Sequence, residues 1–294
     1  MPRIAYVNGQ YVPHQDASIH IEDRGFQFAD SVYEVIALMG GRLADEQGHL
    51  DRLERSLKEL SISMPIGRRA MQFAVREMVR RNRQKDGMIY MQVTRGTAPR
   101  DFKFPQHKNS ALVMTFYPAN FDVALRKAAV KKAITVPDIR WKRRDIKTTA
   151  LIAQVLAKQA AAEKGAYEAW MVDEEGFVTE GSSSNAWIID KKGNLITRPT
   201  ANNTILKGVT RSALQALCKK EKIKIVERPF TVAEAYKAKE AFTSSAVALI
   251  APVVEIDGRK IGDGKAGAIT CKILDMYMDY AKDHGRKQEG WHPK

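Results

Sequence analysis

Hydrophobic and polar residues follow two different periods along the first third of the chain. They alternate in IAYVNGQYVP around Asn8-Gly9, a dipeptide typical of two-residue hairpin turns, so the pattern predicts a short opening hairpin. The stretch ASIHIEDRGFQFADSVYEVIALMGGRLA contains two strand-like runs separated by the polar segment RGFQFAD, with Gly40-Gly41 as the next turn. From Asp45 onward the spacing becomes helical.

Two helices and two strands complete the predicted first half. Leucines recur three or four residues apart from Leu50 to Leu60, which favours a helix with Arg52 at the edge of its apolar stripe. A second helix is expected after the turn segment MPIG. The runs MIYMQVTRG and SALVMTFYP predict strands, and TAPRDFKFP, which holds Arg100, predicts a loop between them.

The segment YPAN predicts a linker, because proline interrupts a sheet ladder and a new apolar pattern follows it. We therefore expect two domains, residues 1–119 and 120–294. In the second, strands are expected at 133–136, 168–173, 186–190, 195–197, 222–230 and on both sides of a turn in 240–258, and helices at 149–164, from Thr210, from Thr231 and at 267–285. Strands and helices mix without regular alternation, so the predicted fold class is α+β.

Charge raises the question of an anionic partner. Lys and Arg exceed Asp and Glu by 48 to 34, a formal net charge of +14. The basic residues are dispersed, and neither an RNA-binding aromatic motif nor a zinc-ligand spacing accompanies them. We therefore expect solvated basic faces, with no nucleic-acid partner and no metal site. The alternative from another functional class is a basic nucleic-acid-binding protein without catalysis.

The remaining bulk features indicate an ordinary globular chain. With 44% hydrophobic residues, its 294 residues can form two cores. Cys218 and Cys271 belong to no CxxC pair and are expected to be small apolar residues. No stretch approaches 18 apolar residues, and the first residues lack the apolar core of a signal peptide. These features predict a cytoplasmic protein with no membrane partner.

Candidate chemistry concentrates between residues 143 and 185. Lys147 lies where RRDIKTT gives way to a helical pattern, and Glu180 lies in GFVTEGSSSN. A lysine can form a Schiff base with an aldehyde cofactor, and a carboxylate can keep a ring nitrogen protonated. The loop in ILKGVTR precedes a helix whose first amides could hold a phosphate. Taken alone, these residues also fit an ordinary lysine and common turns.

Seven motifs occur together in the order and spacing of the fold-type IV pyridoxal-phosphate enzymes. They are DRGFQFADSVYEV, HLDRLERS, IYMQVTRGTAPR, DIKTT, VTEGSSSN, ILKGVTR and FTSSAVALIAPVVEIDG. The chain resembles this family from about Ala5 to Gly258, and within it most resembles the D-amino-acid aminotransferases. The resemblance implies a smaller N-terminal α/β domain and a larger C-terminal domain with a β-barrel-like core that binds pyridoxal 5′-phosphate. It also implies a homodimer with active sites shared between subunits.

The resemblance assigns each cofactor-binding residue a role. Lys147 would be the catalytic Schiff-base lysine, and Glu180 would be the partner of the pyridine nitrogen. Six further residues are implied to contact the cofactor: Arg52, Val209, Thr210 and Ser245 at the phosphate, Ala246 beside them through its backbone amide, and Leu206 against the ring. Ala246 departs from the family pattern, which has a hydroxyl residue there.

Substrate recognition rests on two residues and one departure. Tyr33 and Arg100 match positions that hold the substrate α-carboxylate, with Arg100 supplied by the other subunit of the dimer. By spacing alone, Tyr33 could equally be a core aromatic. The family commonly has a histidine at the position of Phe102, and the phenylalanine side chain cannot donate a hydrogen bond. Carboxylate binding then rests on Arg100 and Tyr33, or Arg95 or another base replaces the missing donor.

By resemblance, the expected reaction is transamination between an amino donor, D-alanine, and a 2-oxo acid acceptor, 2-oxoglutarate, giving pyruvate and D-glutamate. The alternatives within the family are a branched-chain aminotransferase, an (R)-amine transaminase and an aminodeoxychorismate lyase. The loop RGTAPRDFKFP favours D-amino acids because it supplies an arginine for a carboxylate. Phe102 keeps the (R)-amine transaminase open, since that enzyme needs an apolar pocket there.

Overall fold

The computed structural model describes residues 3–107 and 109–287, which belong to two compact units. The first unit comprises Met1–Asn120, Ile146–Ala150 and Lys282–Lys294, and the second comprises Phe121–Asp145 and Leu151–Ala281. The expected domains had one boundary, after residue 119. The structure differs because the chain returns to the first unit at residues 146–150, the segment that carries Lys147.

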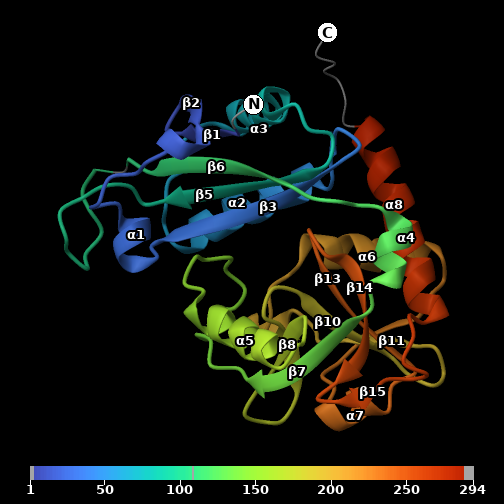
Figure 1. The fold of residues 1–294 in the computed structure, drawn as a ribbon. Coiled ribbons are helices and arrows are strands. Elements are labelled where there is room, and N and C mark those ends of the chain that lie inside the picture. The colour runs from blue at the N-terminus through green and yellow to red at the C-terminus, as the bar shows by residue number, and fades with distance from the viewer. Residues whose placement is uncertain (1–2, 108, 288–294) are drawn as a thin grey trace. The chain divides into compact units, whose positions relative to one another are not determined.

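The first unit is built on a six-stranded antiparallel sheet with strand order β2-β1-β6-β5-β3-β4 (Figure 1). Its strands are β1 (Ile4–Val7), β2 (Gln10–Pro13), β3 (Ser31–Met39), β4 (Arg42–Leu43), β5 (Gly87–Thr94) and β6 (Ala111–Pro118). The predicted hairpin is confirmed: β1 and β2 pair across Asn8 and Gly9, whose φ angles of 46° and 96° match the primed turn.

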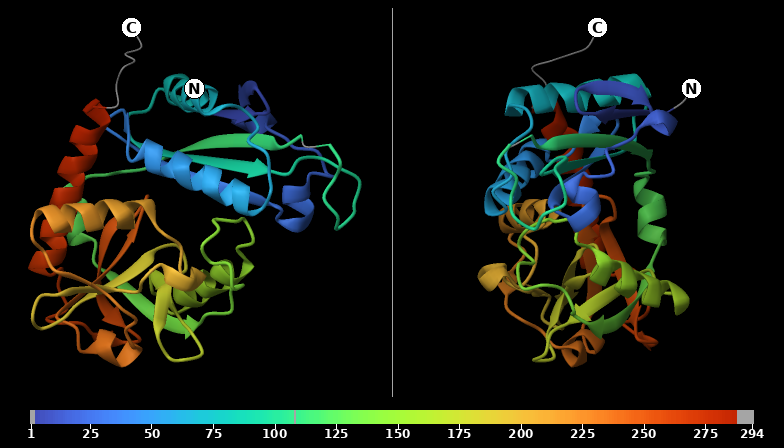
Figure 2. Two further views of the ribbon diagram at one scale, coloured as in Figure 1. Left: turned by 180° about the vertical axis from the view of Figure 1, so that it is seen from behind. Right: turned by 90° about the vertical axis from the view of Figure 1, so that its left-hand side faces the viewer.

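Two helices pack against this sheet through one apolar core (Figures 1 and 2). They are α2 (Glu46–Glu59) and α3 (Arg68–Asn82), and both confirm the predicted helices. Leu50, Leu53 and Leu57 of α2 are each 1% exposed, as their helical spacing requires. The same spacing leaves Arg52 beside the buried stripe.

One predicted strand is wrong. The run ASIHIED forms no strand; a 3-10 turn, η1 (His14–Asp16), precedes it and a short helix, α1 (Arg24–Phe28), follows it. Ile19 and Ile21 are 43% and 76% exposed, so the alternating apolar residues have no sheet face to cover. Helix α1 begins instead at Asp23, whose carboxylate accepts a hydrogen bond from the backbone of Gly25 (2.8 Å).

The second unit contains a nine-stranded mixed sheet. Its main path is β12-β11-β10-β13-β14-β7-β8-β9, with β15 paired to β14, and the pairs β11–β12, β14–β7 and β7–β8 are parallel. The strands are β7 (Lys131–Pro137), β8 (Glu168–Val172), β9 (Val178–Gly181), β10 (Asn185–Ile189), β11 (Leu195–Thr197), β12 (Ile225–Glu227), β13 (Glu240–Ser245), β14 (Leu249–Ile256) and β15 (Arg259–Lys260). The predicted α+β class, with a curled half-barrel sheet in this unit, is confirmed.

The helices of this unit complete the chain. They are α4 (Val123–Ala128), α5 (Ile152–Glu163), the 3-10 turn η2 (Ala201–Asn203), α6 (Val209–Lys220), α7 (Val232–Tyr236) and α8 (Ala268–Lys287), of which the residues up to Ala281 belong to this unit. The predicted capping box is confirmed, with Thr231 and Glu234 bonding each other's backbone. Helix α5 begins three residues later than expected, because Thr149 pairs with the first unit.

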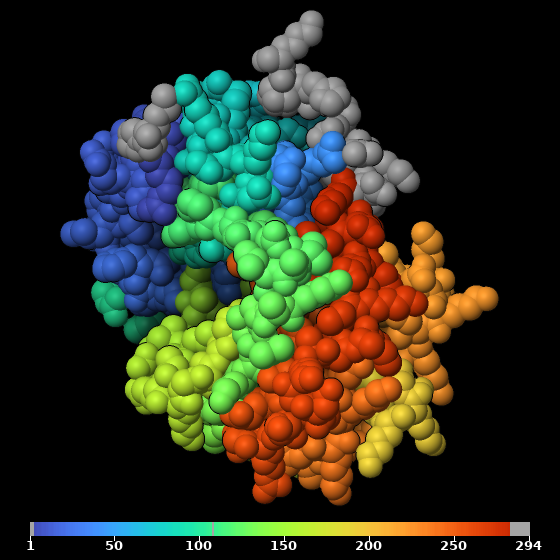
Figure 3. All heavy atoms as spheres, turned by 45° about the vertical axis from the view of Figure 1, so that its right-hand side comes forward, coloured from blue at the N-terminus to red at the C-terminus, as the bar shows by residue number. Residues whose placement is uncertain are grey.

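One face of the second unit is covered by α4 and α8, which lie against each other in the space-filling view (green and red in Figure 3). Lys127 of α4 and Asp275 of α8 form an ion pair of 2.7 Å between them. Among the residues described, no helix is both long enough and apolar enough to cross a membrane.

Candidate active site

Lys147 lies in a short segment, residues 146–150, that runs beside the start of β3. The backbone amide of Tyr33 donates to the carbonyl of Lys147 (3.0 Å), and the amide of Thr149 donates to the carbonyl of Ser31 (3.2 Å). These two hydrogen bonds pair the segment with β3 as in a β-sheet, although the segment is too short to count as a strand. They fix the backbone of Lys147, and its side chain lies over the side chain of a β3 residue.

That neighbour is the aromatic ring of Tyr33. The Lys147 Nζ lies 4.0 Å from the centre of the Tyr33 ring, and the Tyr33 ring stacks on Tyr90 at 5.5 Å. The Tyr90 hydroxyl donates to Gln92 (2.7 Å), and burial raises the pKa of Tyr90. Tyr33 is half-buried, and its ring lies between Tyr90 and Lys147. The structure therefore brings Tyr33 and Lys147 together.

Arg52 is oriented by a buried carboxylate. Its Nε and one terminal nitrogen donate to the two oxygens of Glu34 (2.7 and 2.8 Å), and the His49 Nδ1 lies 2.7 Å from Glu34. Burial disfavours the charge on Glu34, but Arg52 and His49 outweigh burial and lower the pKa of Glu34 to about 2. Ser56, one helical turn after Arg52, faces the backbone amide of Lys147 at 3.5 Å.

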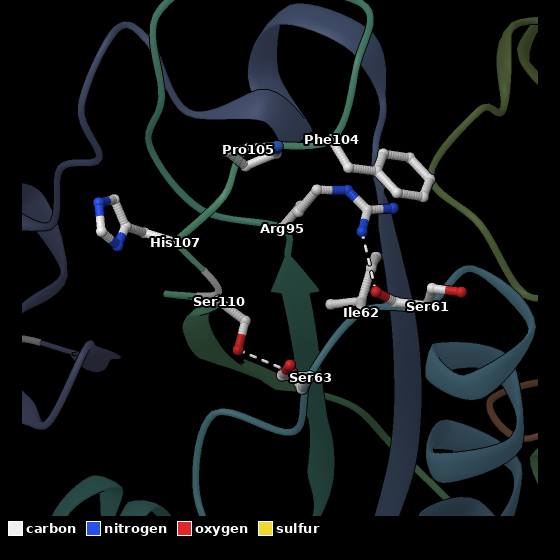
Figure 4. A pocket seen from close by; sticks show the side chains of 8 residues that line it. All are labelled: Ser61, Ile62, Ser63, Arg95, Phe104, Pro105, His107 and Ser110. Atoms are coloured by element: carbon white, nitrogen blue, oxygen red, sulfur yellow. Dashed lines mark hydrogen bonds between the residues drawn. The ribbon is translucent and has the colours of Figure 1, made fainter.

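Arg95 is an anchor for the loop that follows β5. Its guanidinium donates to both oxygens of Asp30 (2.7 and 2.9 Å) and to the carbonyls of Leu60 and Ser61 (2.8 and 2.9 Å). Phe104 lies over it, 3.7 Å from the ring centre, beside a cavity of about 140 Å³ (Figure 4). Because these N–H groups are already bonded, Arg95 is poorly suited to replace the missing hydrogen-bond donor to the substrate carboxylate.

Arg100 is in the opposite condition. It is exposed, and its guanidinium makes no hydrogen bond with the residues in 3–107 and 109–287; its contact is with the ring of Phe28, 4.7 Å away. Arg24, which also lies over Phe28, donates to Asp30 (2.9 Å) and to the carbonyl of Asp101. Of the three arginines around this loop, Arg100 keeps its N–H donors available for a carboxylate.

In the second unit, Glu180 is buried and surrounded by donors. It accepts hydrogen bonds from the guanidinium of Arg140, from Asn185 (2.9 Å) and from the backbone amide of Leu206 (3.1 Å). Burial raises the pKa of Glu180, while the charge and hydrogen bond of Arg140 oppose that rise. Asp138 holds Arg140 from the other side, at 2.9 and 2.8 Å.

The start of α6 offers free donors close to this carboxylate. Gly208 caps the helix without a side-chain hydrogen bond, so the first amides, from Val209 onward, lack a side-chain cap. A Cβ at Gly208 would lie 2.2 Å from the Asn185 side chain, which explains the glycine. The hydroxyl of Thr210 is buried and has no hydrogen-bond partner among the described residues.

A second donor group lies in the turn after β13. The Ser245 hydroxyl accepts from the amide of Ala248 (3.1 Å), which leaves its own proton available to another acceptor. Arg126 of α4 donates to the carbonyls of Val247 and Ala248, both at 3.0 Å, and so holds the turn. At Ala246 only the backbone amide can serve, because the side chain is apolar.

These residues fit a phosphorylated aldehyde cofactor with a ring nitrogen. The first unit brings Lys147 and Tyr33 together and holds Arg52 on Glu34, and the second unit brings Glu180 together with the loop before α6. The orphaned hydroxyl of Thr210 and the uncapped helix start are suited to phosphate oxygens, which accept such donors. A buried carboxylate is suited to a protonated ring nitrogen.

Comparison with known proteins agrees with this chemistry. Residues 31–256 match the family model described as Amino-transferase class IV. The chain is 37% identical over 279 residues to a D-alanine aminotransferase of Staphylococcus haemolyticus, covering 94% of this chain and 96% of that protein. The chain therefore belongs to the class IV aminotransferase family, is an aminotransferase, and uses pyridoxal 5′-phosphate.

Solved structures share the fold. A branched-chain aminotransferase from Thermoproteus uzoniensis, solved with norvaline, has a TM-score of 0.85 and 27% identity, covering 98% of this chain and 96% of that one. A hypothetical aminotransferase from Mycobacterium tuberculosis in a PLP-bound form has a TM-score of 0.82 at 20% identity, covering 96% of this chain and 99% of that one. These likenesses confirm the expected fold-type IV architecture.

Sequence patterns missed the residues that hold the site residues in place. Glu34 left a usable signal: it is a charged residue inside the apolar run SVYEVIALM, and such a residue usually has a buried partner. Asp138, Arg140 and Arg126 left none, because they lie in polar segments where charged residues are ordinary. Close to Lys147 in the sequence, Arg143 forms an ion pair with Asp145 (3.0 Å).

Proposed function

We propose that this aminotransferase moves the amino group of a D-amino acid, D-alanine first of all, to 2-oxoglutarate, giving pyruvate and D-glutamate. The observation that carries the proposal is the uncommitted guanidinium of Arg100 on the loop after β5. A planar guanidinium with free donors matches a carboxylate in a bidentate manner. Support for the donor comes from the similarity to the D-alanine aminotransferase of Staphylococcus haemolyticus.

When bound, pyridoxal 5′-phosphate supplies an electron sink for the bond that breaks at the substrate α-carbon. In our proposal the Nζ of Lys147 would hold the cofactor covalently, and as a free amine the same Nζ would carry the proton of the substrate α-carbon. Glu180, oriented by hydrogen bonds from Arg140 and Asn185, would hold the proton on the ring nitrogen. Leu206 would lie against the cofactor ring.

The phosphate, in the same proposal, takes donors from three elements. Arg52 supplies a charge on α2, oriented by Glu34. Val209 and Thr210 supply amides at the start of α6, and Thr210 adds its unpartnered hydroxyl. Ser245 supplies a hydroxyl proton and Ala246 a backbone amide. Alanine in place of a hydroxyl residue at position 246 removes one side-chain donor but keeps this amide.

We further propose a homodimer, in which Arg100 serves the site of the partner subunit, working in the cytoplasm. The exposed face of α5 supports association: Ile152, Val155 and Leu156 are 72%, 57% and 54% exposed at a helical spacing of three and four. An apolar stripe of this kind on a soluble chain is typical of a contact surface. Sedimentation of the purified chain should give twice the mass of 33.0 kDa.

The experiment that tests the reaction is a panel of single half-reactions followed by the absorbance of the bound cofactor. The donors are D-alanine, L-leucine, (R)-1-phenylethylamine and aminodeoxychorismate. Reaction with D-alanine, and formation of D-glutamate when 2-oxoglutarate follows, is the expected result. Lys147→Ala should lose the absorbance band of the covalently held cofactor.

Other outcomes identify the relatives instead. Reaction with L-leucine and not D-alanine would assign branched-chain transamination. Preference for (R)-1-phenylethylamine would mean that Phe102, 83% exposed and apolar, decides the pocket, and the donor proposed here would be wrong. Reaction with aminodeoxychorismate alone would assign lyase chemistry. A colourless protein that does not bind added pyridoxal 5′-phosphate would contradict the conclusion that the chain is a pyridoxal-phosphate enzyme.

A further inference from the structure

The ring of Phe28 is the meeting point of three side chains in the first unit. The guanidinium carbon of Arg100 lies 4.7 Å from its centre, that of Arg24 lies 4.8 Å from it, and the Phe102 ring lies 5.5 Å away. Phe28 ends helix α1, whereas Arg100 and Phe102 belong to the loop after β5. One aromatic ring thus connects the helix to the loop.

We propose that Phe28 is a positioning residue that holds the Arg100 guanidinium ready for the substrate carboxylate, with Phe102 packed against it in place of a hydrogen-bonding side chain. This rests on the proposed function, which makes Arg100 the carboxylate-binding residue. A cation over an aromatic ring is attracted without using its N–H donors. Phe28 can therefore orient Arg100 and leave every donor available to the ligand.

Phe28 is well supported for such a task. Asp23 caps the start of α1 through Gly25 and also accepts from the hydroxyl of Thr94 on β5 (2.8 Å), so the helix is tied to the sheet. Arg24, over the same ring, is fixed by Asp30 and by the carbonyl of Asp101. A residue held by packing and hydrogen bonds on regular structure positions a neighbour better than a loop residue does.

The two arginines at Phe28 do different work. Arg24 is 4% exposed and its donors bind Asp30 and Asp101, so it ties the loop down. Arg100 is exposed and makes no hydrogen bond in the described part of the chain. The ring therefore joins one structural arginine to one functional arginine. Removing the ring should loosen Arg100 while Asp30 and Asp101 still hold the loop.

The test compares Phe28→Leu with Phe28→Tyr in the holoenzyme. Phe28→Leu should raise the KM for D-alanine about two- to fivefold, the loss expected for an exposed cation–π contact, with kcat changed less than twofold. Phe28→Tyr, which keeps a ring, should behave like the wild type. Turnover of (R)-1-phenylethylamine, which has no carboxylate, should be unaffected by either change. Propionate, titrated against cofactor absorbance, should lose affinity by the same factor as D-alanine.

A double-mutant cycle separates this role from general loop packing. In an Arg100→Ala background, Phe28→Leu should cause no further rise in the KM for D-alanine, because the group that it positions is absent. Phe26→Leu is the matched control, since Phe26 lies on the same helix, is 71% exposed and contacts no arginine with its ring among the described residues. Its KM should equal that of the wild type.

Three results would overturn the inference: an unchanged KM in Phe28→Leu, an equal rise in both Arg100 backgrounds, or a Phe28→Tyr variant as impaired as Phe28→Leu. Failure of the proposed function has a different signature. There, the wild type fails to react with D-alanine, or Arg100→Ala leaves the KM for D-alanine and the affinity for propionate unchanged.

Discussion

Lys147 and Tyr33 contact each other twice, through the backbone and through the side chains. The Tyr33 amide donates to the Lys147 carbonyl at 3.0 Å, and the Lys147 Nζ lies 4.0 Å from the centre of the Tyr33 ring. Tyr33 is therefore a support for the lysine as well as a candidate ligand for the substrate. The two roles depend on different atoms of the tyrosine, the ring and the hydroxyl.

Tyr33→Phe should separate them. The ring remains against Lys147 and Tyr90, so the absorbance of the bound cofactor should stay at wild-type intensity. The KM for D-alanine should rise about tenfold or more, because a hydrogen bond to a charged group contributes roughly 1.5–3 kcal/mol. Steady-state kinetics measure this, with (R)-1-phenylethylamine as the carboxylate-free control. An unchanged KM for D-alanine would remove the hydroxyl from carboxylate binding.

The pair of Glu34 and Arg52 predicts a pH-dependent stability. The pKa of Glu34 is about 2 in the folded protein against an ordinary 4.5, so its ionised form stabilises the fold above pH 4.5 and that contribution is lost as the pH falls towards 2. The difference corresponds to about 3 kcal/mol, at about 1.4 kcal/mol per tenfold change. Glu34→Gln should lower the free energy of unfolding by roughly this amount at pH 7.

Urea unfolding of wild type and Glu34→Gln at pH 7 and pH 3 checks the sign. The gap between the two proteins should shrink by more than half at pH 3. Glu54→Gln is the control on the same helix: its ion pair with Arg68 is 40% exposed at the glutamate, and such pairs contribute at most about 1 kcal/mol. A gap that is the same at both pH values would show that Glu34 is not ionised through Arg52.

Thr210 predicts a change in cofactor affinity without a loss of stability. Its buried hydroxyl has no partner in the described residues, so Thr210→Val removes an unsatisfied group and should leave the free energy of unfolding of the cofactor-free protein unchanged or higher. The dissociation constant of pyridoxal 5′-phosphate should rise about tenfold through the lost hydrogen bond to a charged oxygen. Absorbance titration and urea unfolding measure the two quantities.

The matched control is Thr270→Val. The Thr270 hydroxyl is also buried, but it donates to Glu240 at 2.8 Å. That variant should lose stability and keep the cofactor affinity of the wild type, the reverse of Thr210→Val. Cofactor binding by Thr210→Val as tight as in the wild type would mean that the hydroxyl faces something other than the phosphate.

Sequence patterns correctly predicted the elements that depend on the spacing of nearby residues. The leucines of α2, the Asn8-Gly9 turn and the Thr231 capping box each depend on neighbours within a few residues, so local chemistry decides them. The strand predicted around Ile19 and Ile21 was wrong, because an alternating pattern does not show whether the segment has a sheet face to pack against. Of the candidate site, motifs indicated Lys147 and Glu180, to which the proposed function assigns the chemistry.

The supporting residues could not be predicted in the same way. Glu34 and Arg52 are 18 positions apart, and Arg140 and Glu180 are 40 apart, so their pairing depends on the completed sheets. The choice between Arg95 and Arg100 also needed the structure. Both are arginines beside one loop, and only the hydrogen bonds to Asp30 and to two carbonyls reveal which is occupied.

The return of the chain to the first unit at residues 146–150 has a consequence for how the protein can be divided. A fragment ending at Asn120 would lack the segment whose backbone bonds Ser31 and Tyr33, and would expose the start of β3 as an unpaired edge. No single cut therefore yields two complete units. Supplying residues 146–150 as a separate peptide should restore the edge, which makes this short segment the piece that any split version of the protein has to share.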